Sequence, residues 1–260
     1  MTQPDYTAVT EVTGYKVTRE QLQRMYTRYR FASEYSYGKT VLEVACGSGQ
    51  GLGYLAKTAQ KVVGGDIDEN NLAFARGYYA ARPTIELRQL DAHKLPFAEA
   101  SFDVVILYEA IYYLAHPEQF VSEAKRVLRA SGTLIICLAN KDLPDFNPSP
   151  HSCQYFSAHE LTRLLREGGF KDVQLLGDCP ATKQTGKDRA VSLIKRTAVA
   201  LHLVPKTMKG KEILKRIFVG KLQSLPPEID DSTAVYTEPV KIPADSVNRE
   251  YKVLFATGCV

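Results

Sequence analysis

The first residues with a chemical signature lie where an apolar run stops at a cluster of small residues, in "VLEVACGSGQGLGYLA" from Val41 to Ala56. The β-branched apolar run predicts a buried strand, and the glycines after it predict a turn that leads into a helix. Such a turn presents free backbone N–H groups and the positive end of a helix dipole to a ligand. The run is therefore a candidate cofactor-binding turn, formed by Ala45, Gly47, Ser48 and Gly49.

A dinucleotide is the first ligand to consider for this turn, because its fingerprint is G-x-G-x-x-G/A after a strand. Started at Gly47, the fingerprint needs a small residue at Leu52, and started at Gly49 it needs one at Tyr54. Both frames fail, and the Gly-Lys-Ser/Thr of a P-loop does not follow the turn. The sequence therefore argues against a nicotinamide-dependent oxidoreductase.

Acidic residues accompany the neighbouring predicted strands, with Glu43 inside the first, Asp66 at the end of the second and Asp91 at the end of the third. S-adenosylmethionine has an ammonium group, a sulfonium and an adenosine, but no pyrophosphate. It needs an acid near its ammonium, backbone room for its methionine part and a carboxylate for its ribose diol, since charge-assisted hydrogen bonds are strong. We expect Glu43, Asp66 and Asp91 to meet the ammonium, the ribose and the adenine amino group. The Ala92 amide and the side chain of Ile67 are expected beside the adenine.

These residues must be held by neighbouring strands, and hydrophobic periodicity predicts where the strands lie. Strand-like and helix-like segments alternate along most of the chain. This alternation is typical of right-handed crossovers and a parallel sheet with helices on both faces. The predicted strands are 40–45, 61–68, 85–92, 102–110, 133–140, 171–177 and 250–258, and the predicted helices are 19–35, 50–59, 69–82, 117–132 and 157–170.

The chain between the sixth and the last predicted strand has a composition of its own. Between Lys183 and Lys221 there are eleven Lys or Arg and two Asp or Glu, whereas the whole chain has a net charge of +4. Helices are predicted over 189–203 and 211–222. Three interpretations of the basic segment 183–222 stay open: a docked helix with a solvated rim, a lid over the acceptor pocket, and contact with an anionic partner such as a membrane surface. No RNA-binding module accompanies it, which argues against a nucleic-acid partner.

Several segments in a fixed order resemble one known family, the class I S-adenosylmethionine-dependent methyltransferases, and within it the branch with "D-A…LPF…SFDVV". The resemblance implies a Rossmann-like, doubly wound α/β fold with a seven-stranded sheet whose last strand is antiparallel. Two positions depart from the family pattern, since Ala45 replaces the usual first glycine and Ser131 replaces the proline before Gly132. Alanine is small enough to keep the turn. The matching segments cover roughly 39–177 and are "VLEVACGSG", "VVGGDID", "LDAHKLPFAEASFDVVILYEA", "RVLRASGTLII" and "LTRLLREGGF".

Three parts of the chain are expected from these patterns. Residues 1–38 form an N-terminal helical cap, in which Arg28 is expected to reach the methionine carboxylate of the cofactor. Residues 39–180 and 247–260 form the S-adenosylmethionine-binding domain. Residues 181–246 form a basic helical insertion before the last strand.

Candidates for the chemistry lie after the fourth and fifth predicted strands. Methyl transfer from a sulfonium is an in-line displacement, in which a neutral amine needs no strong base but an alcohol must lose a proton. Tyr108 and Glu109 end the fourth strand at the carboxyl edge of the sheet, where Tyr108 is expected to contact the cofactor. The long loop 140–157 opens at the same edge and carries His151 and Tyr155. Glu109, His151 and Tyr155 are therefore the predicted catalytic residues.

The resemblance implies a methyltransferase that acts on a small molecule, and the loop "FNPSPHSCQYFS" resembles loops of sugar- or glycan-modifying members. The alternatives are a binding module that has lost catalysis and an N-methyltransferase of a small amine. No apolar run of about 18 residues is available to span a membrane. The five cysteines are scattered and lack zinc-ligand spacing, so no metal is expected. An odd number of cysteines without a signal-peptide pattern favours reduced thiols and a cytoplasmic location.

Overall fold

The computed structural model describes residues 12–181, 222–244 and 246–260 of the chain. Its strands form at runs of β-branched and apolar residues, because these side chains pack well on a pleated, buried surface. The strands are β1 (Lys16–Val17), β2 (Thr40–Val44), β3 (Lys61–Asp66), β4 (Ile85–Gln89), β5 (Phe102–Tyr108), β6 (Leu128–Ala139), β7 (Lys171–Pro180), β8 (Gln223–Ser224), β9 (Val240–Lys241) and β10 (Tyr251–Cys259).

The longer helices begin at residues that cap their free N–H groups. The side chains of Thr18 and Ser157 each accept a hydrogen bond from the backbone N–H three residues later. In turn, the side-chain oxygens of Gln21 and Glu160 accept from the backbone N–H of Thr18 and Ser157. These capping boxes fix the starts of two helices. The helices are α1 (Arg19–Ser36), α2 (Leu52–Leu55), α3 (Glu69–Tyr79), α4 (Pro117–Val127) and α5 (Ala158–Glu167), with a short 3-10 helix η2 (Ile111–Tyr113) between β5 and α4.

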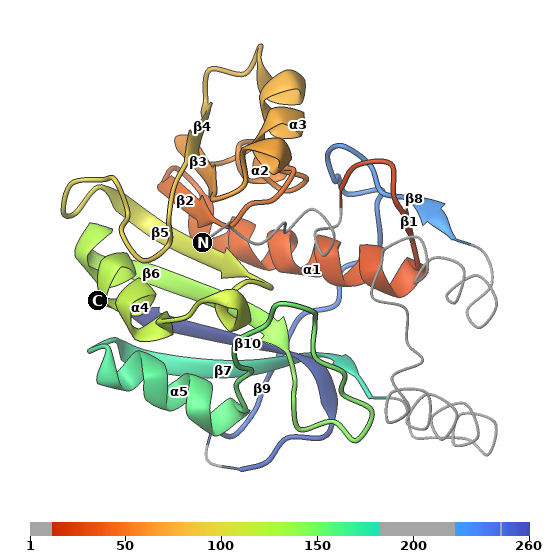
Figure 1. Cartoon of the computed structure of the whole chain (residues 1–260), viewed down its shortest axis with the longest axis vertical. Coiled ribbons are helices and arrows are strands. Elements are labelled where there is room, and N and C mark those ends of the chain that lie inside the picture. The colour runs from red at the N-terminus through yellow and green to blue at the C-terminus, as the bar shows by residue number, and fades with distance from the viewer. Residues whose placement is uncertain (1–11, 182–221, 245) are drawn as a thin grey trace.

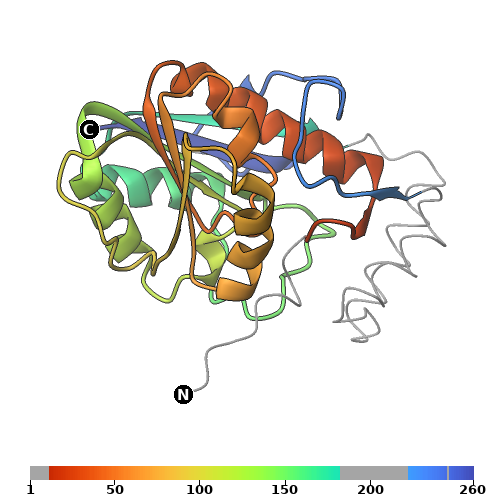
Figure 2. The same ribbon diagram turned by 90° about the horizontal axis from the view of Figure 1, so that it is seen from above.

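One eight-stranded sheet has the order β4-β3-β2-β5-β6-β10-β7-β9, with helices on both faces (Figure 1, Figure 2). The strands from β2 to β6 pair in parallel, whereas β10 is antiparallel to β6 and β7. This confirms the predicted doubly wound α/β fold with an antiparallel last strand. The short edge strand β9 pairs with β7 and adds an eighth strand to the expected seven.

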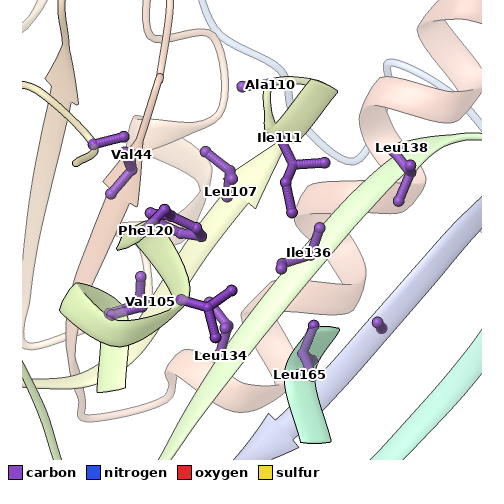
Figure 3. Packing of buried hydrophobic residues seen from close by; sticks show 14 of the residues in the cluster. Val44, Val105, Leu107, Ala110, Ile111, Phe120, Leu134, Ile136, Leu138 and Leu165 are labelled. Atoms are coloured by element: carbon purple, nitrogen blue, oxygen red, sulfur yellow. The ribbon is translucent and has the colours of Figure 1, made fainter. Parts of the chain in front are cut away.

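Two hydrophobic clusters, one on each face of the sheet, hold the helices. Val105 and Leu107 of β5 pack in the cluster that contains α4 and α5, and Val104 and Ile106 pack in the cluster with α1, α2 and α3. Figure 3 shows Phe120 of α4 beside Val105 and Leu107. The helices therefore cover the faces of the sheet and leave the carboxyl ends of the parallel strands for a ligand.

Two predicted helices are shorter than expected. Helix α2 is a single turn within the predicted 50–59, because the chain already bends after Leu55 to enter β3. Helix α4 ends at Val127 rather than at residue 132, because Leu128 is extended and pairs with Phe102 of β5. Strand β6 therefore begins five residues before its predicted start.

The segment before β10 is described over 222–244. Strand β8 in this segment pairs antiparallel with β1, and β9 lies at the edge of the main sheet. Residues 182–221 lie outside the described residues, and with them nearly all of the basic segment 183–222 and of its two predicted helices. Among the helices that the structure describes, none is long and apolar enough to cross a membrane.

We expect Phe120→Ala to lower the free energy of unfolding by about 3–5 kcal/mol, because it leaves a cavity at a fully buried position. Urea denaturation measures this loss. The matched control is Phe74→Ala on α3, where the ring is 52% exposed and the change should stay within about 0.5 kcal/mol. Equal effects at the two positions would contradict the described core.

Candidate cofactor and acceptor site

A cavity of about 430 Å³ lies at the carboxyl ends of β2, β3, β5 and β6. Its wall is built by α1, by the turn after β2, by the ends of β3 and β4, and by the segment after β5. The parallel register brings these strand ends together, although they lie far apart in the sequence. Ten residues singled out from the sequence line it, namely Arg28, Glu43, Ala45, Gly47, Asp66, Ile67, Asp91, Ala92, Tyr108 and Glu109.

The turn after β2 has a left-handed backbone at three positions, Ala45 (φ 57°), Gly47 (φ 57°) and Gly49 (φ 80°). A non-glycine residue in this conformation is strained by about 1 kcal/mol or more, which surrounding contacts must offset. A Cβ at Gly49 would lie 2.9 Å from the Cβ of Ala75, so this glycine lets the turn pack against α3. Ser48 and Gly49 belong to this turn but do not line the cavity.

Asp66 joins the end of β3 to this turn. Its Oδ2 accepts a hydrogen bond from the Gly47 N–H, and its Oδ1 accepts one from the Asp68 N–H, both at 2.9 Å. Burial raises the pKa of the Asp66 carboxyl, and the two backbone donors partly offset this effect. The carboxylate therefore fixes the turn while it also faces the cavity.

Glu43 is a buried carboxylate with one satisfied oxygen. The Tyr29 hydroxyl donates to its Oε1 at 2.6 Å, whereas its Oε2 is buried and has no hydrogen-bond partner among the described residues. Burial raises the pKa of Glu43 to about 7, although the Tyr29 hydrogen bond and the positive charge of Arg28 act in the opposite direction. A buried carboxylate oxygen that lacks a donor on a cavity wall suits a cationic ligand group. The residues present therefore fit the ammonium of S-adenosylmethionine.

Asp91 and His93 form a pair at the end of β4. Asp91 Oδ1 accepts from the His93 N–H at 2.9 Å and lies 2.7 Å from His93 Nδ1. The His116 N–H donates to His93 Nε2, so Nδ1 carries the proton in the neutral ring. Partial burial acts to raise the pKa of Asp91, but the hydrogen bonds from His93 lower it on balance. His93 also lines the cavity, although no sequence pattern marks it as a site residue.

Glu109 follows the last residue of β5 and also lines the cavity. Its backbone is left-handed (φ 51°), and its N–H donates to the Cys137 carbonyl oxygen of β6 at 2.8 Å. Its Oε1 lies 3.5 Å from Arg28 Nη1, and its Oε2 accepts from the Tyr112 hydroxyl at 3.1 Å. The carboxylate is thus held on the cavity wall by one cation and one hydroxyl.

The other two predicted catalytic side chains do not line the cavity. The Tyr155 ring stacks on Tyr112 with ring centroids 4.2 Å apart, and its hydroxyl accepts from the Ser149 N–H. His151 is exposed in the loop. Because the loop folds over η2, Ser149 faces the cavity where His151 and Tyr155 were expected. Tyr155 thus contacts Tyr112 and Ser149, both of which line the cavity.

Sequence reasoning assigned no site role to several residues of the wall. Three of these lie on α1 at three- and four-residue spacing, and this periodicity was the available signal. Those after β5 and in the loop had no such signal. The residues are Gln21, Arg24 and Met25 of α1, with Gln50, Asn71, Leu90, Tyr112, Tyr113, Leu114 and Ser149.

A strap formed by residues 225–231 covers the turn from outside. The Ile229 N–H donates to the Gln50 carbonyl oxygen at 3.0 Å, and the Ile229 side chain is fully buried. Asp231 accepts from the hydroxyl groups of Tyr26 on α1 and Tyr54 on α2, at 2.9 and 2.6 Å. The strap thereby connects α1 to the helix that follows the cofactor turn.

Comparison with known proteins agrees with this geometry. Residues 42–136 match the methyltransferase domain family. Over 146 residues the chain is 36% identical to a probable S-adenosylmethionine-dependent methyltransferase of Mycolicibacterium smegmatis, which covers 54% of this chain and 55% of the relative. Over 100 residues it is 37% identical to phthiotriol/phenolphthiotriol dimycocerosates methyltransferase 1 of Mycobacterium ulcerans, which covers 38% and 36%. The chain spans about half the length or less of these curated relatives.

Solved structures share the fold at low sequence identity. The YcgJ protein of Bacillus subtilis superimposes with a TM-score of 0.59 at 14% identity, covering 92% of this chain and 98% of its own. The [4+2]-cyclase SpnF superimposes with a TM-score of 0.59 at 17% identity, covering 96% and 87%. The fold and site thus define a Rossmann-like class I domain. The sequence matches identify residues 42–136 as a methyltransferase domain similar to that of S-adenosylmethionine-dependent methyltransferases, with S-adenosylmethionine as its cofactor.

We expect Gly51→Ala to weaken binding of S-adenosylhomocysteine, the demethylated cofactor, by about tenfold, because overpacking at such a contact costs about 1–3 kcal/mol. A Cβ at Gly51 would lie 2.0 Å from Tyr29 Cε1, so the ring must move away from Glu43. Calorimetry measures the affinity. The matched control is Gly77→Ala on α3, where an added Cβ meets nothing within 4 Å. Unchanged affinity in Gly51→Ala would contradict the role of Tyr29.

We also expect Glu43 to make stability and binding respond to pH in opposite directions. Its pKa of about 7 in the folded chain exceeds the ordinary 4.5, so the folded state retains a proton that the unfolded chain has lost. The free energy of unfolding without ligand should therefore fall as the pH rises from about 4.5 to about 7. Affinity for the ammonium-bearing ligand should rise through about pH 7, as the carboxylate ionises.

Glu43→Gln is neutral at every pH and should remove both responses. Thermal unfolding and calorimetry between about pH 5 and pH 8 measure them. Glu118→Gln, at an exposed position on α4, is the control and should keep the wild-type profiles. Identical profiles for wild type and Glu43→Gln would show that Glu43 does not titrate in this range.

Proposed function

We propose that this chain transfers a methyl group from S-adenosylmethionine to a small molecule. One observation carries the proposal: the same cavity is lined by Glu43, whose buried Oε2 has no hydrogen-bond partner among the described residues, and by Glu109. Bound S-adenosylmethionine would supply a methyl group on a positively charged sulfur. The protein then has to bind the two reactants in line and exclude water, which accounts for much of the rate in such a displacement.

Five charged residues of the wall have a proposed role. Glu43 would bind the ammonium group, Asp66 the ribose diol and Asp91 the adenine amino group. Arg28 would meet the methionine carboxylate, since its guanidinium lies on the same wall. Glu109 would orient the acceptor and take a proton from it where the acceptor is an alcohol.

The acceptor that we propose first is a hydroxyl of a sugar or glycan. Its support is the presence of Glu109 as a proton acceptor, together with the loop resemblance described above. A second candidate follows from the Mycobacterium ulcerans relative, whose name specifies phthiotriol and phenolphthiotriol dimycocerosates. We further propose a cytoplasmic protein, since all five cysteines are free thiols.

A screen with isotope-labelled S-adenosylmethionine tests this function on nucleotide sugars, glycans, phenols, long-chain diols and amines. Label in a hydroxyl group supports the proposal, and label only in amines favours the N-methyltransferase alternative. Binding of S-adenosylhomocysteine without transfer to any class would support a binding module that has lost catalysis.

We expect Asp66→Asn to weaken S-adenosylhomocysteine binding by about tenfold or more, because it replaces charge-assisted hydrogen bonds with neutral ones. Calorimetry on the full chain measures the affinity. Asp172→Asn makes the same chemical change at an exposed position outside the cavity wall and should bind as the wild type does. Wild-type affinity in Asp66→Asn would refute the ribose assignment.

A further inference from the structure

Part of the cavity wall is used by none of the proposed cofactor contacts. We call this part the acceptor end, and it is formed by Gln21 and Arg24 of α1, by Tyr113 and by Ser149. Arg24 is the charged residue among the four, and its guanidinium carries donors but no acceptor. A ligand group with acceptor atoms therefore suits this part of the wall.

Arg24 is placed so that part of its guanidinium faces this end. It lies one helical turn before Arg28 on the same face of α1, and its side chain is 26% exposed. Its Nη2 pairs with Glu20 Oε1 at 2.5 Å. Its Nε is buried and has no hydrogen-bond partner among the described residues. The planar fork of arginine suits a carboxylate or a phosphate at such a position.

The carboxylates around Arg24 already serve other donors. Glu20 also accepts from Lys252 Nζ at 2.7 Å, and Glu109 accepts from Tyr112 while it faces Arg28. The nearby carboxyl of Asp178 is 5% exposed, and burial raises its pKa, which the charges of Arg24 and Arg28 partly offset. The three carboxylates Glu20, Glu109 and Asp178 thus match the three cations Arg24, Arg28 and Lys252 in number. Arg24 Nε nevertheless stays a buried donor without a hydrogen-bond partner among the described residues, and such a cationic donor on a cavity wall favours an anionic group of the ligand.

We propose that the methyl acceptor is an anionic small molecule whose carboxylate or phosphate binds Arg24 at the acceptor end of the cavity. This inference rests on the proposed function and narrows its substrate class. In this arrangement Arg28 binds the methionine carboxylate of the cofactor, and Arg24 binds the anionic group of the acceptor. The Tyr112 ring, backed by the stacked Tyr155, gives a flat wall for the rest of a cyclic acceptor.

Calorimetry on the full chain saturated with S-adenosylhomocysteine tests the inference with defined probes. The acidic probes are glucuronate, glucose 6-phosphate and benzoate, and their neutral partners are glucose for the first two and benzamide for the third. At least one acidic probe should bind about tenfold tighter than its neutral partner, as expected for a charge-assisted contact. Preference for glucuronate or for glucose 6-phosphate identifies a carboxylate or a phosphate, respectively.

Variants of Arg24 show whether this residue is responsible. Arg24→Gln should lose the preference for the acidic probe, and Arg24→Lys should restore part of it, since lysine keeps the charge but not the planar fork. Arg30→Gln removes the same charge from the same helix outside the cavity wall and should keep the preference. S-adenosylhomocysteine affinity should be unchanged in all three.

Two results would overturn the inference while S-adenosylhomocysteine still binds. One is that no acidic probe binds tighter than its neutral partner, and the other is that Arg24→Gln keeps the preference. Failure of S-adenosylhomocysteine to bind the wild type overturns the proposed function itself, and the inference with it. The ligand titration, performed first, separates the two failures.

Discussion

The hydrogen bond between the Tyr29 hydroxyl and Glu43 is the contact on which the geometry of the site depends. It joins α1, which comes before the sheet in the chain, to the central strand β2. A carboxylate in a fully buried position is costly unless donors meet it, so this contact is strongly constrained. Because the bond holds α1 against β2, it helps to position Arg24 and Arg28 of the same helix at the cavity.

The same helix is also held by the strap 225–231. Asp231 accepts hydroxyl hydrogen bonds from Tyr26 and Tyr54, which ties α1 to α2. Ile229 binds the carbonyl group of Gln50 directly after the turn. A segment that follows the basic segment in sequence thus becomes part of the support for the cofactor turn. This arrangement explains why the last strand can enter the sheet so late without leaving the turn exposed.

Charges of both signs line the cavity. Acidic side chains lie where an ammonium, a ribose and an adenine amino group are expected, and Arg28 of α1 pairs with Glu109 on the same wall. These charges act strongly on a ligand, since fields are stronger in a cavity with low-dielectric walls. The shared fold of a cyclase and of methyltransferase relatives shows that the sheet alone does not define the reaction. The side chains at its edge do.

The sequence by itself determined the sheet, the cofactor turn and the acids at the strand ends, such as Asp66 and Asp91. These are local signals, because a buried strand and a glycine turn each have a pattern within a few residues, and parallel pairing then brings the strand ends together. Tertiary structure alone decided that Ser149, not His151, faces the cavity, that α4 ends at Val127, and that Arg24 joins the acceptor end. Those outcomes depend on which surfaces the loop and α1 bury against elements distant in the sequence, and no local pattern encodes that choice.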